Sequence, residues 1–220
     1  MSSMNNDMPF IIAIDGPAAS GKGSLAKKIA QHYEYDFLDT GALYRRVAKK
    51  VIDQNIDPNN ENAVSDAAEQ LKSQITDDYD DNDLRNDSVG SMASVIAQNQ
   101  DVRHILFDSQ RNFAKNAQKG AVLDGRDIGT VIYPEAQIKL FVTASTEERA
   151  KRRLKELHLR GKMVTSAQVL AEMQERDDRD SPRLDQHLAP DHSVEIIDTT
   201  DLSPDEVFQK AIEIIESSRS

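Results

Sequence analysis

The stretch FIIAIDGPAASGKGS, residues 10–24, decides the fold. Its first six residues form a short apolar run, and a glycine-rich turn with a lysine follows directly. Backbone N–H groups of such a turn converge on an anion, the next helix adds its positive N-terminal end, and Lys22 supplies a point charge. The stretch therefore predicts a P-loop that binds nucleotide phosphates, with an ordinary tight turn as the alternative. The residues predicted to hold the phosphates are Gly16, Pro17, Ala18, Ala19, Ser20, Gly21, Lys22, Gly23 and Ser24.

One position of this loop departs from the common pattern G-x-x-x-x-G-K-[ST]. The residue after Lys22 is Gly23, and the hydroxyl comes one residue later, at Ser24. In many P-loop proteins the hydroxyl after the lysine is a ligand of Mg²⁺. The GKG-[ST] variant resembles that of nucleoside monophosphate kinases, in which the metal ion is held mainly by the nucleotide phosphates and water. The chain also lacks N-K-x-D, the guanine-reading motif, so we expect a small-molecule kinase and not a GTPase.

Short apolar runs alternate with long helical patterns along the whole chain. This order is typical of a parallel sheet covered on both faces, and it predicts an α/β P-loop fold with a five-stranded parallel sheet flanked by helices. We expect one domain over residues 1–220. The predicted strands are 10–15, 35–39, 121–124, 138–142 and 194–198; helices are expected at 22–33 and 43–52 and after two Ser-x-x-Glu capping boxes, 145–148 and 203–206, the second with Pro204 at the first helical position.

Composition restricts the partners. The chain has 220 residues, a net charge of −11, 38% hydrophobic residues and no cysteine. A disulfide framework and a thiolate metal site are excluded, and an acidic surface repels nucleic acids and anionic membranes. The start MSSMNNDMPF has no apolar core of a signal peptide, and no apolar run approaches the ~20 residues of a spanning helix. We expect a cytoplasmic monomer with small-molecule substrates, and no nucleic-acid or membrane partner.

A second anion site is predicted where the second strand ends. The segment LDTGALYRR, residues 38–46, follows that strand. We expect Thr40 to cap the next helix, which places Tyr44 and Arg45 near its positive end. A helix N-terminus and a guanidinium together can hold a phosphate. The alternative is an ordinary amphipathic helix with solvated arginines.

The third strand is followed by LDGRDIG, residues 123–129. Arg126 and Asp127 emerge there at the carboxyl edge of the sheet, where open α/β sheets bind ligands. Asp124, at the end of the strand, is a candidate for the water shell of a metal ion. A buried helix cap is an equally good interpretation of that residue.

Two arginine-rich segments follow the fourth strand, and such segments are often solvated salt-bridge ladders. Beside a P-loop they predict a lid over residues 150–185 that clamps the transferring phosphoryl group, because this chemistry needs Lys, Arg and Mg²⁺ and no protein nucleophile. The first segment, 148–161, places Arg149, Arg153, Glu156 and Arg160 on one helical face; the second, 175–183, places Arg176, Asp180 and Arg183 at i, i+4 and i+7, with Pro182 expected to end the helix. The predicted catalytic residues are Lys22, Arg126, Arg149 and Arg153.

Five segments occur in the order of bacterial cytidylate kinases, which the chain resembles over residues 11–200: GPAASGKG, LDTGALYR, DGRDIGTVIYP, ASTEERAKRR and ERDDRD. The resemblance implies ATP-dependent phosphorylation of CMP and dCMP, with Mg²⁺. It implies that Arg45 and Arg126 hold the acceptor phosphate with Thr40 and Tyr44 nearby, that Ser94, Arg111, Asp127 and Arg183 read the cytosine, and that Arg176 and Asp180 contact the sugar.

Such a base-reading group is chemically sensible. Cytosine presents an N4 amine donor beside the N3 and O2 acceptors. Asp127 would accept from N4, while Arg111 or Arg183 would donate to N3 and O2. Uracil presents O4 to the carboxylate and leaves a buried charge poorly matched, which is costly. We therefore expect C to be preferred over U.

The acceptor-binding region, residues 45–95, differs from the family pattern. Its insert, about residues 70–90, is short and contains TDDYDDNDLRND, residues 76–87. This acidic segment, with few large apolar residues, is expected to be an exposed turn or mobile tip. The alternative, a calcium site, is rejected because the spacing lacks the glycine and the terminal glutamate of a calcium loop. Two other functions stay open: a different small-molecule kinase, such as a shikimate-like one, and a non-catalytic ATP-binding protein.

Overall fold

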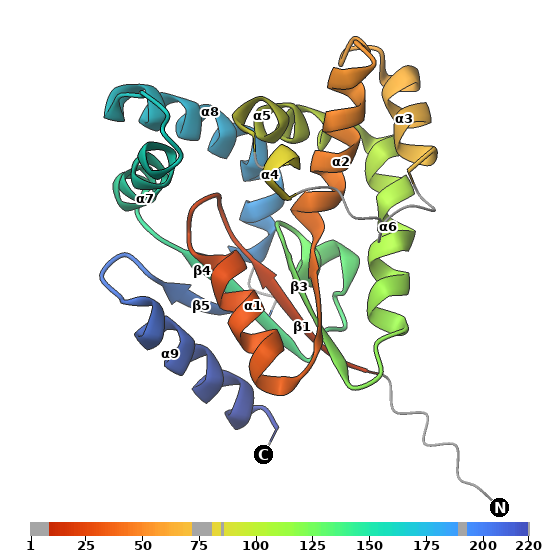
Figure 1. The fold of residues 1–220 in the computed structure, drawn as a ribbon. Coiled ribbons are helices and arrows are strands. Elements are labelled where there is room, and N and C mark those ends of the chain that lie inside the picture. Colours follow the sequence, from red (N-terminus) through yellow and green to blue (C-terminus); the bar gives the residue numbers. More distant parts are fainter. Residues whose placement is uncertain (1–8, 72–80, 85, 189–192, 220) are drawn as a thin grey trace, which may run out of the picture.

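The computed structural model describes residues 9–71, 81–84, 86–188 and 193–219. The strands β1 (Phe10–Asp15), β2 (Asp36–Asp39), β3 (Gly120–Gly125), β4 (Ile138–Thr143) and β5 (Glu195–Asp198) form one sheet in the order β2-β3-β1-β4-β5. Every pairing is parallel. The predicted five-stranded parallel sheet is therefore confirmed, and β1, which leads into the P-loop, is its central strand (Figure 1).

Two layers of helices cover the sheet because successive side chains of each strand point to opposite faces. Ile12 and Ile14 of β1 pack with α1 (Lys22–Tyr33) and α9 (Pro204–Ser217). Ile11 and Ala13 belong to the core on the other face. That core includes α2 (Thr40–Asp53), α3 (Glu61–Glu69), α5 (Asp87–Ile96), α6 (Gln100–Lys115) and the π-helix η2 (Ile128–Ile132).

The remaining helices lie beyond the carboxyl ends of the strands. α4 (Asp81–Leu84) belongs to the predicted acceptor-binding region, whereas α7 (Thr146–Leu159) and α8 (Ser166–Leu184) form a helical pair where the lid is predicted. Figure 1 shows this pair beside α5, across the sheet edge where β1 ends. Most of the acidic segment lies outside the described residues, so the predicted turn at 76–87 stays a prediction. No described helix is long and apolar enough to cross a membrane.

Helix ends test three local predictions. The capping box at Ser203 is complete, with Pro204 at the start of α9, whereas Ser145 makes only the half in which its hydroxyl accepts from the backbone N–H of Glu148. Thr40 was predicted as the cap of α2 and is not: the carboxylate of Asp39 accepts from Ala42 N at 3.2 Å. Aspartate is an equally good cap, so Thr40 is free to donate to the carbonyl oxygen of Asp124.

The predicted end of α8 at Pro182 is wrong. The helix continues through Pro182 to Leu184, and a 3₁₀ turn, η3 (Asp185–Leu188), extends it. A proline inside a helix removes one hydrogen bond, but the end of α8 is tied down by side chains. The Ser181 hydroxyl donates to Asp185 at 2.8 Å, and the Gln186 amide donates to the Pro182 carbonyl at 3.2 Å. These contacts carry the chain from the predicted lid back toward the sheet.

Candidate active site

The predicted P-loop has the required geometry. It runs from the buried end of β1 to α1, and Gly16 and Gly21 have φ values of 147° and 91°. A Cβ atom on Gly16 would lie 2.0 Å from the carbonyl oxygen of Val142 in β4. No side chain fits there, so this glycine is a packing requirement as well as a conformational one. The Nζ atom of Lys22 donates to the carbonyl of Pro17 at 3.3 Å, which folds the lysine back over the loop.

The unusual Gly23 is explained by its neighbour Asp124. A Cβ atom at position 23 would lie 3.0 Å from Oδ2 of Asp124, closer than ordinary packing allows. Asp124 therefore is not a helix cap: it stands against the start of α1, with Oδ1 3.9 Å from Nζ of Lys22. Burial raises the pKa of Asp124, while Lys22 opposes this shift. Burial and the positive Arg126 lower the pKa of Lys22 to about 8.

Two adjoining cavities open at the carboxyl edge of the sheet. The larger, ≈ 340 Å³, lies between the P-loop and α7–α8, and Arg153 and Arg160 line it. The smaller, ≈ 250 Å³, reaches toward α2 and α5. Arg45, Asp124 and Arg176 line both. The smaller cavity brings together every predicted acceptor-binding residue except Arg111: Thr40, Tyr44, Arg45, Ser94, Arg126, Asp127, Arg176, Asp180 and Arg183.

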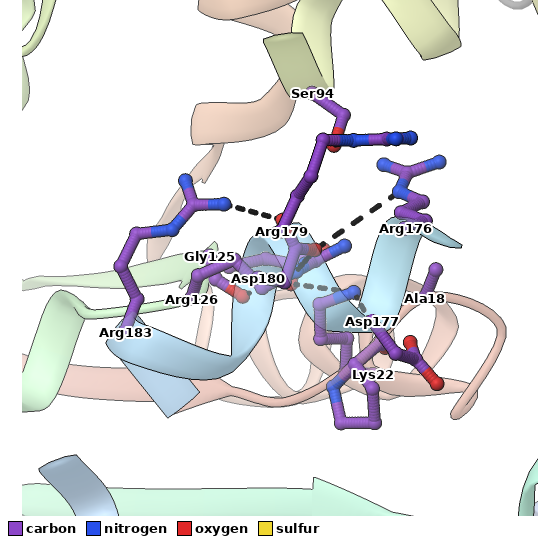
Figure 2. A network of polar contacts seen from close by, with 12 residues as sticks. Ala18, Lys22, Ser94, Gly125, Arg126, Arg176, Asp177, Arg179, Asp180 and Arg183 are labelled. Carbon is purple, nitrogen blue, oxygen red and sulfur yellow. Dashed lines mark hydrogen bonds and ion pairs between the residues drawn. The ribbon is translucent and has the colours of Figure 1, made fainter. Parts of the chain in front are cut away.

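Asp180 is the centre of the ionic network in this cavity (Figure 2). Nε of Arg126 donates to its carboxylate at 2.8 Å, Arg183 forms an ion pair with it, and Nε of Arg176 lies 4.0 Å away. Burial opposes ionisation of Asp180, but the three guanidinium groups outweigh it and lower its pKa. One carboxylate thus holds three cations in a buried place, which concentrates positive charge where an anionic ligand can enter.

Arg111 does not line the cavity, so the structure does not bring it together with the other predicted base-reading residues. Its guanidinium donates to the carbonyl of Ile132 at 2.6 Å, pairs with Glu135 and lies 4.4 Å from the ring centre of Tyr133. These are contacts of the outer surface around η2. Helix periodicity groups the side chains of α6 by face, but it does not say which face meets the cavity.

Arg103, which the sequence analysis missed, is the arginine of α6 that reaches Asp127, although it does not itself line the cavity. It forms an ion pair with Asp127, and both side chains are largely buried. Burial opposes the charge of Arg103, but the neighbouring Asp127 raises its pKa. One signal was available: Arg103 lies at i−3 and i−7 from Leu106 and Gln110, which are buried on α6. Of these three residues, Gln110 is the one that lines the cavity.

The predicted lid arginines separate into two kinds. Arg153 lines the larger cavity and pairs with Asp87 of α5. Arg149 was predicted on the clamping face with it, but it is only 4% exposed and lines neither cavity. Its guanidinium donates to the P-loop carbonyl of Ala18 at 3.3 Å and forms a bidentate pair with Asp177 of α8. Arg149 therefore fastens α7 to the P-loop and to α8. The sequence does not show this role, because these partners come within reach of Arg149 only in the folded chain.

Arg152 is a second anchor that the sequence analysis did not single out. It donates to the P-loop carbonyl of Ser20 at 3.4 Å and to both the hydroxyl and the carbonyl of Thr199, which follows β5. The hydroxyl of Thr199 donates to Ser20 as well. The backbone of the P-loop is therefore held from two sides, by the predicted lid and by the segment after β5.

The parallel sheet, the P-loop and the cationic cavity beside the loop together define the class of protein: it has the fold of a P-loop kinase. A search of solved structures agrees about the fold. An uncharacterized protein from Eubacterium ventriosum matches with a TM-score of 0.56 at 18% identity, covering 94% of this chain and 98% of that one. A shikimate kinase from Bacteroides thetaiotaomicron matches with a TM-score of 0.50 at 12% identity, with the same coverage.

Sequence comparison identifies the family. The family model described as cytidylate kinase matches residues 12–217. A cytidylate kinase of Paramagnetospirillum magneticum is 49% identical over 214 residues, which is 96% of this chain and 100% of the relative. The chain belongs to the cytidylate kinase family, as its five motifs predict.

Proposed function

We propose that the protein transfers the γ-phosphoryl group of ATP to CMP or dCMP, in the reversible reaction ATP + CMP ⇌ ADP + CDP. The observation that carries this proposal is the small cavity beside the P-loop, where buried cations surround one carboxylate and a second buried carboxylate, Asp127, stands apart with Arg103. The first group suits a phosphate and a ribose. The second suits the donor and acceptor edge of cytosine.

The chemistry follows from charge and position. An oxygen of the acceptor phosphate is the nucleophile, and it is ionised at neutral pH, so no strong general base is needed. Lys22, Arg126 and Arg176 place positive charge around the point where the two phosphate sites meet. Phosphoryl transfer depends mainly on such positioning and neutralisation. Arg153 lies at the edge of the larger cavity and is assigned to the donor side.

The side chains also fit a Mg²⁺ ion held mainly by phosphates and water. Oδ1 of Asp124 is buried and has no hydrogen-bond partner among the described residues, and Asp124 lines both cavities. A carboxylate in this position can accept hydrogen bonds from metal-bound water. Gly23 leaves the room that Asp124 occupies. The bound ion would supply charge neutralisation on the transferring phosphate.

Recognition of cytosine is assigned to the pair Asp127–Arg103. The carboxylate would accept from the N4 amine, and the guanidinium holds it at a fixed angle. Arg183, on the other side of the cavity, would donate to the acceptor edge of the base. Uracil would place O4 against Asp127, and a buried carboxylate without a donor is costly. CMP is therefore preferred over UMP.

The test is ADP production with Mg·ATP against CMP, dCMP, UMP, AMP, GMP and shikimate, with a control that contains no acceptor. Turnover confined to CMP and dCMP supports the proposal. Turnover with another acceptor would support kinase activity but overturn the proposed base contacts, and ATP binding without any turnover would favour a non-catalytic protein.

Asp127→Asn should reduce the preference for CMP over UMP, because an amide can rotate to donate to O4. Equal losses with CMP and UMP would overturn the role of Asp127.

Several earlier expectations stay predictions: the division into an acceptor-binding region at 45–95 and a lid at 150–185, the monomeric state and the cytoplasmic location. CMP and dCMP carry the same base and phosphate, so the preference between them also stays open until the acceptor panel measures it.

A further inference from the structure

His187 is a buried histidine that the proposed reaction does not use. It lies in η3, directly after the predicted lid helix α8, and is 4% exposed. Its Nε2 atom is 3.0 Å from the backbone carbonyl of Arg126 and 3.4 Å from Oδ2 of Asp15. A carbonyl oxygen can only accept, so Nε2 carries the proton and donates. The ring packs against Phe141, with the ring centres 5.2 Å apart.

Asp15, the last residue of β1, holds the same turn from the opposite side. Its carboxylate accepts from the backbone N–H groups of Ile128 at 2.9 Å and Gly129 at 2.8 Å. The backbone from residue 126 to residue 129 is therefore held at its start by His187 and at its end by Asp15. Arg126 is held twice, because its side chain donates to Asp180 of α8.

Burial raises the pKa of Asp15 to about 7, and the nearby charges of Asp127 and Asp124 act in the same direction, against the two backbone donors. A buried carboxylate in this position depends on every donor that reaches it. The Nε2–H of His187, which donates to the Arg126 carbonyl, also points its partial positive charge within 3.4 Å of Oδ2 of Asp15. The imidazole thus stabilises both the Arg126 carbonyl and the carboxylate that holds the other end of the turn.

We propose that His187 is a positioning residue of the acceptor site: by fixing the Arg126 carbonyl and contacting Asp15, it sets the directions in which the Arg126 and Asp127 side chains enter the cavity. Those side chains are the ones assigned to the acceptor phosphate and the base, so this inference rests on the proposed function. A displacement of about 1 Å in such a group can reduce activity by about a hundredfold. Within the described part of the chain, His187 makes no hydrogen bond to P-loop residues 16–24, so ATP binding should be much less sensitive.

Three substitutions separate positioning from general stability. His187→Phe keeps a ring against Phe141 and removes the donor. His187→Gln carries an amide N–H near the place of Nε2, whereas the shorter His187→Asn does not reach it. We expect Phe and Asn to raise the KM for CMP about tenfold, equivalent to ~1.4 kcal/mol, while the KM for ATP changes less than about twofold. Gln should return the KM for CMP to within about threefold of the unsubstituted enzyme.

Thermal unfolding of each variant checks that the protein is folded, and the contrast between Gln and Asn remains decisive if Phe does not fold. An unchanged KM for CMP in Asn, equal increases for CMP and ATP, or a folded Gln variant that behaves like Asn would overturn the proposal. Hydrogen exchange of the backbone segment 126–129 gives a readout that needs no substrate, and it should be faster in Asn than in Gln. If the unsubstituted enzyme does not phosphorylate CMP, the proposed function fails, while the exchange contrast still tests the role of His187.

Discussion

Two arginines of α6 give the sharpest test of the site. Arg103→Gln removes the charge that is paired with Asp127 and keeps a polar side chain of moderate length. Arg111→Gln is the matched control, because it makes the same change on the same helix at an arginine that pairs with Glu135 and not with Asp127. The resemblance implies base reading by Arg111, whereas Arg103 is the arginine that pairs with Asp127, the carboxylate proposed to bind the base.

The magnitudes follow from burial. The Arg103 and Asp127 side chains are 16% and 9% exposed, and removing one partner of a buried pair costs about 3–5 kcal/mol because the other charge stays behind. Some solvent access reduces this, so we expect a loss of ~2–4 kcal/mol in the free energy of unfolding. For a chain of this size each 1 kcal/mol lowers Tm by about 2–4 °C. The expected decrease in Tm is therefore about 4–16 °C.

Arg103→Gln should also weaken the binding of CMP. Without Arg103, Asp127 is free to rotate away from the base, and a hydrogen bond to a charged group is worth about 1.5–3 kcal/mol. The KM for CMP is expected to rise about 10- to 150-fold, since 1.4 kcal/mol is a factor of ten. Arg111 pairs with a more exposed Glu135, and such surface pairs contribute about 0.2–1 kcal/mol. Arg111→Gln should leave the KM for CMP within about twofold of the unsubstituted value.

The assay is coupled ADP production at saturating Mg·ATP, with thermal unfolding of the same samples. A variant that is unfolded at the assay temperature is excluded by its own melting curve, and the assay is then run below that temperature. If Arg111→Gln raises the KM for CMP as much as Arg103→Gln does, or if Arg103→Gln changes neither quantity, the assignment of Arg103 to Asp127 is refuted.

Three further predictions concern the P-loop. The pKa of Lys22 is lowered to about 8 by burial and Arg126, so the free enzyme loses this positive charge as pH rises through 8; kcat/KM for ATP should fall there, and a flat profile up to pH 10 would contradict the shift. Gly23→Ser should lower kcat at least about tenfold with Tm nearly unchanged, because the new Cβ displaces the Asp124 carboxylate; normal turnover would show that Asp124 has no role. Arg149→Met removes the contacts to the P-loop and Asp177 and should lower Tm and raise the KM for ATP, measured with CMP saturating; a loss of kcat alone would instead support the original assignment of Arg149 to the phosphoryl group.

The sheet and the P-loop were predictable because their signals are local. Five apolar runs of strand length and a glycine-rich turn between strand and helix depend only on neighbouring residues, and all five strands occur within one residue of their predicted ends. Gly23 was recognised as unusual from the pattern alone. Its packing reason was not visible, because Asp124 is far away in the sequence and meets it only at the carboxyl edge of the sheet.

The candidate site was predictable in composition but not in arrangement. Motif order correctly brought Arg45, Arg126, Asp127 and Asp180 to one cavity. It did not distinguish Arg103 from Arg111, since both lie on the same amphipathic helix and only the packing of α6 decides which one meets Asp127.

What the sequence determined by itself was therefore the order of strands and helices, the phosphate loop and the family, because short-range periodicity and motif spacing encode them. What only the tertiary structure decided was the partner of each charge. Arg149 has the spacing of a surface residue, yet it is buried against Ala18 and Asp177. Asp15 and His187 meet from opposite ends of the chain. The energy of a charged side chain depends on its burial and its partner, and both are properties of the folded chain.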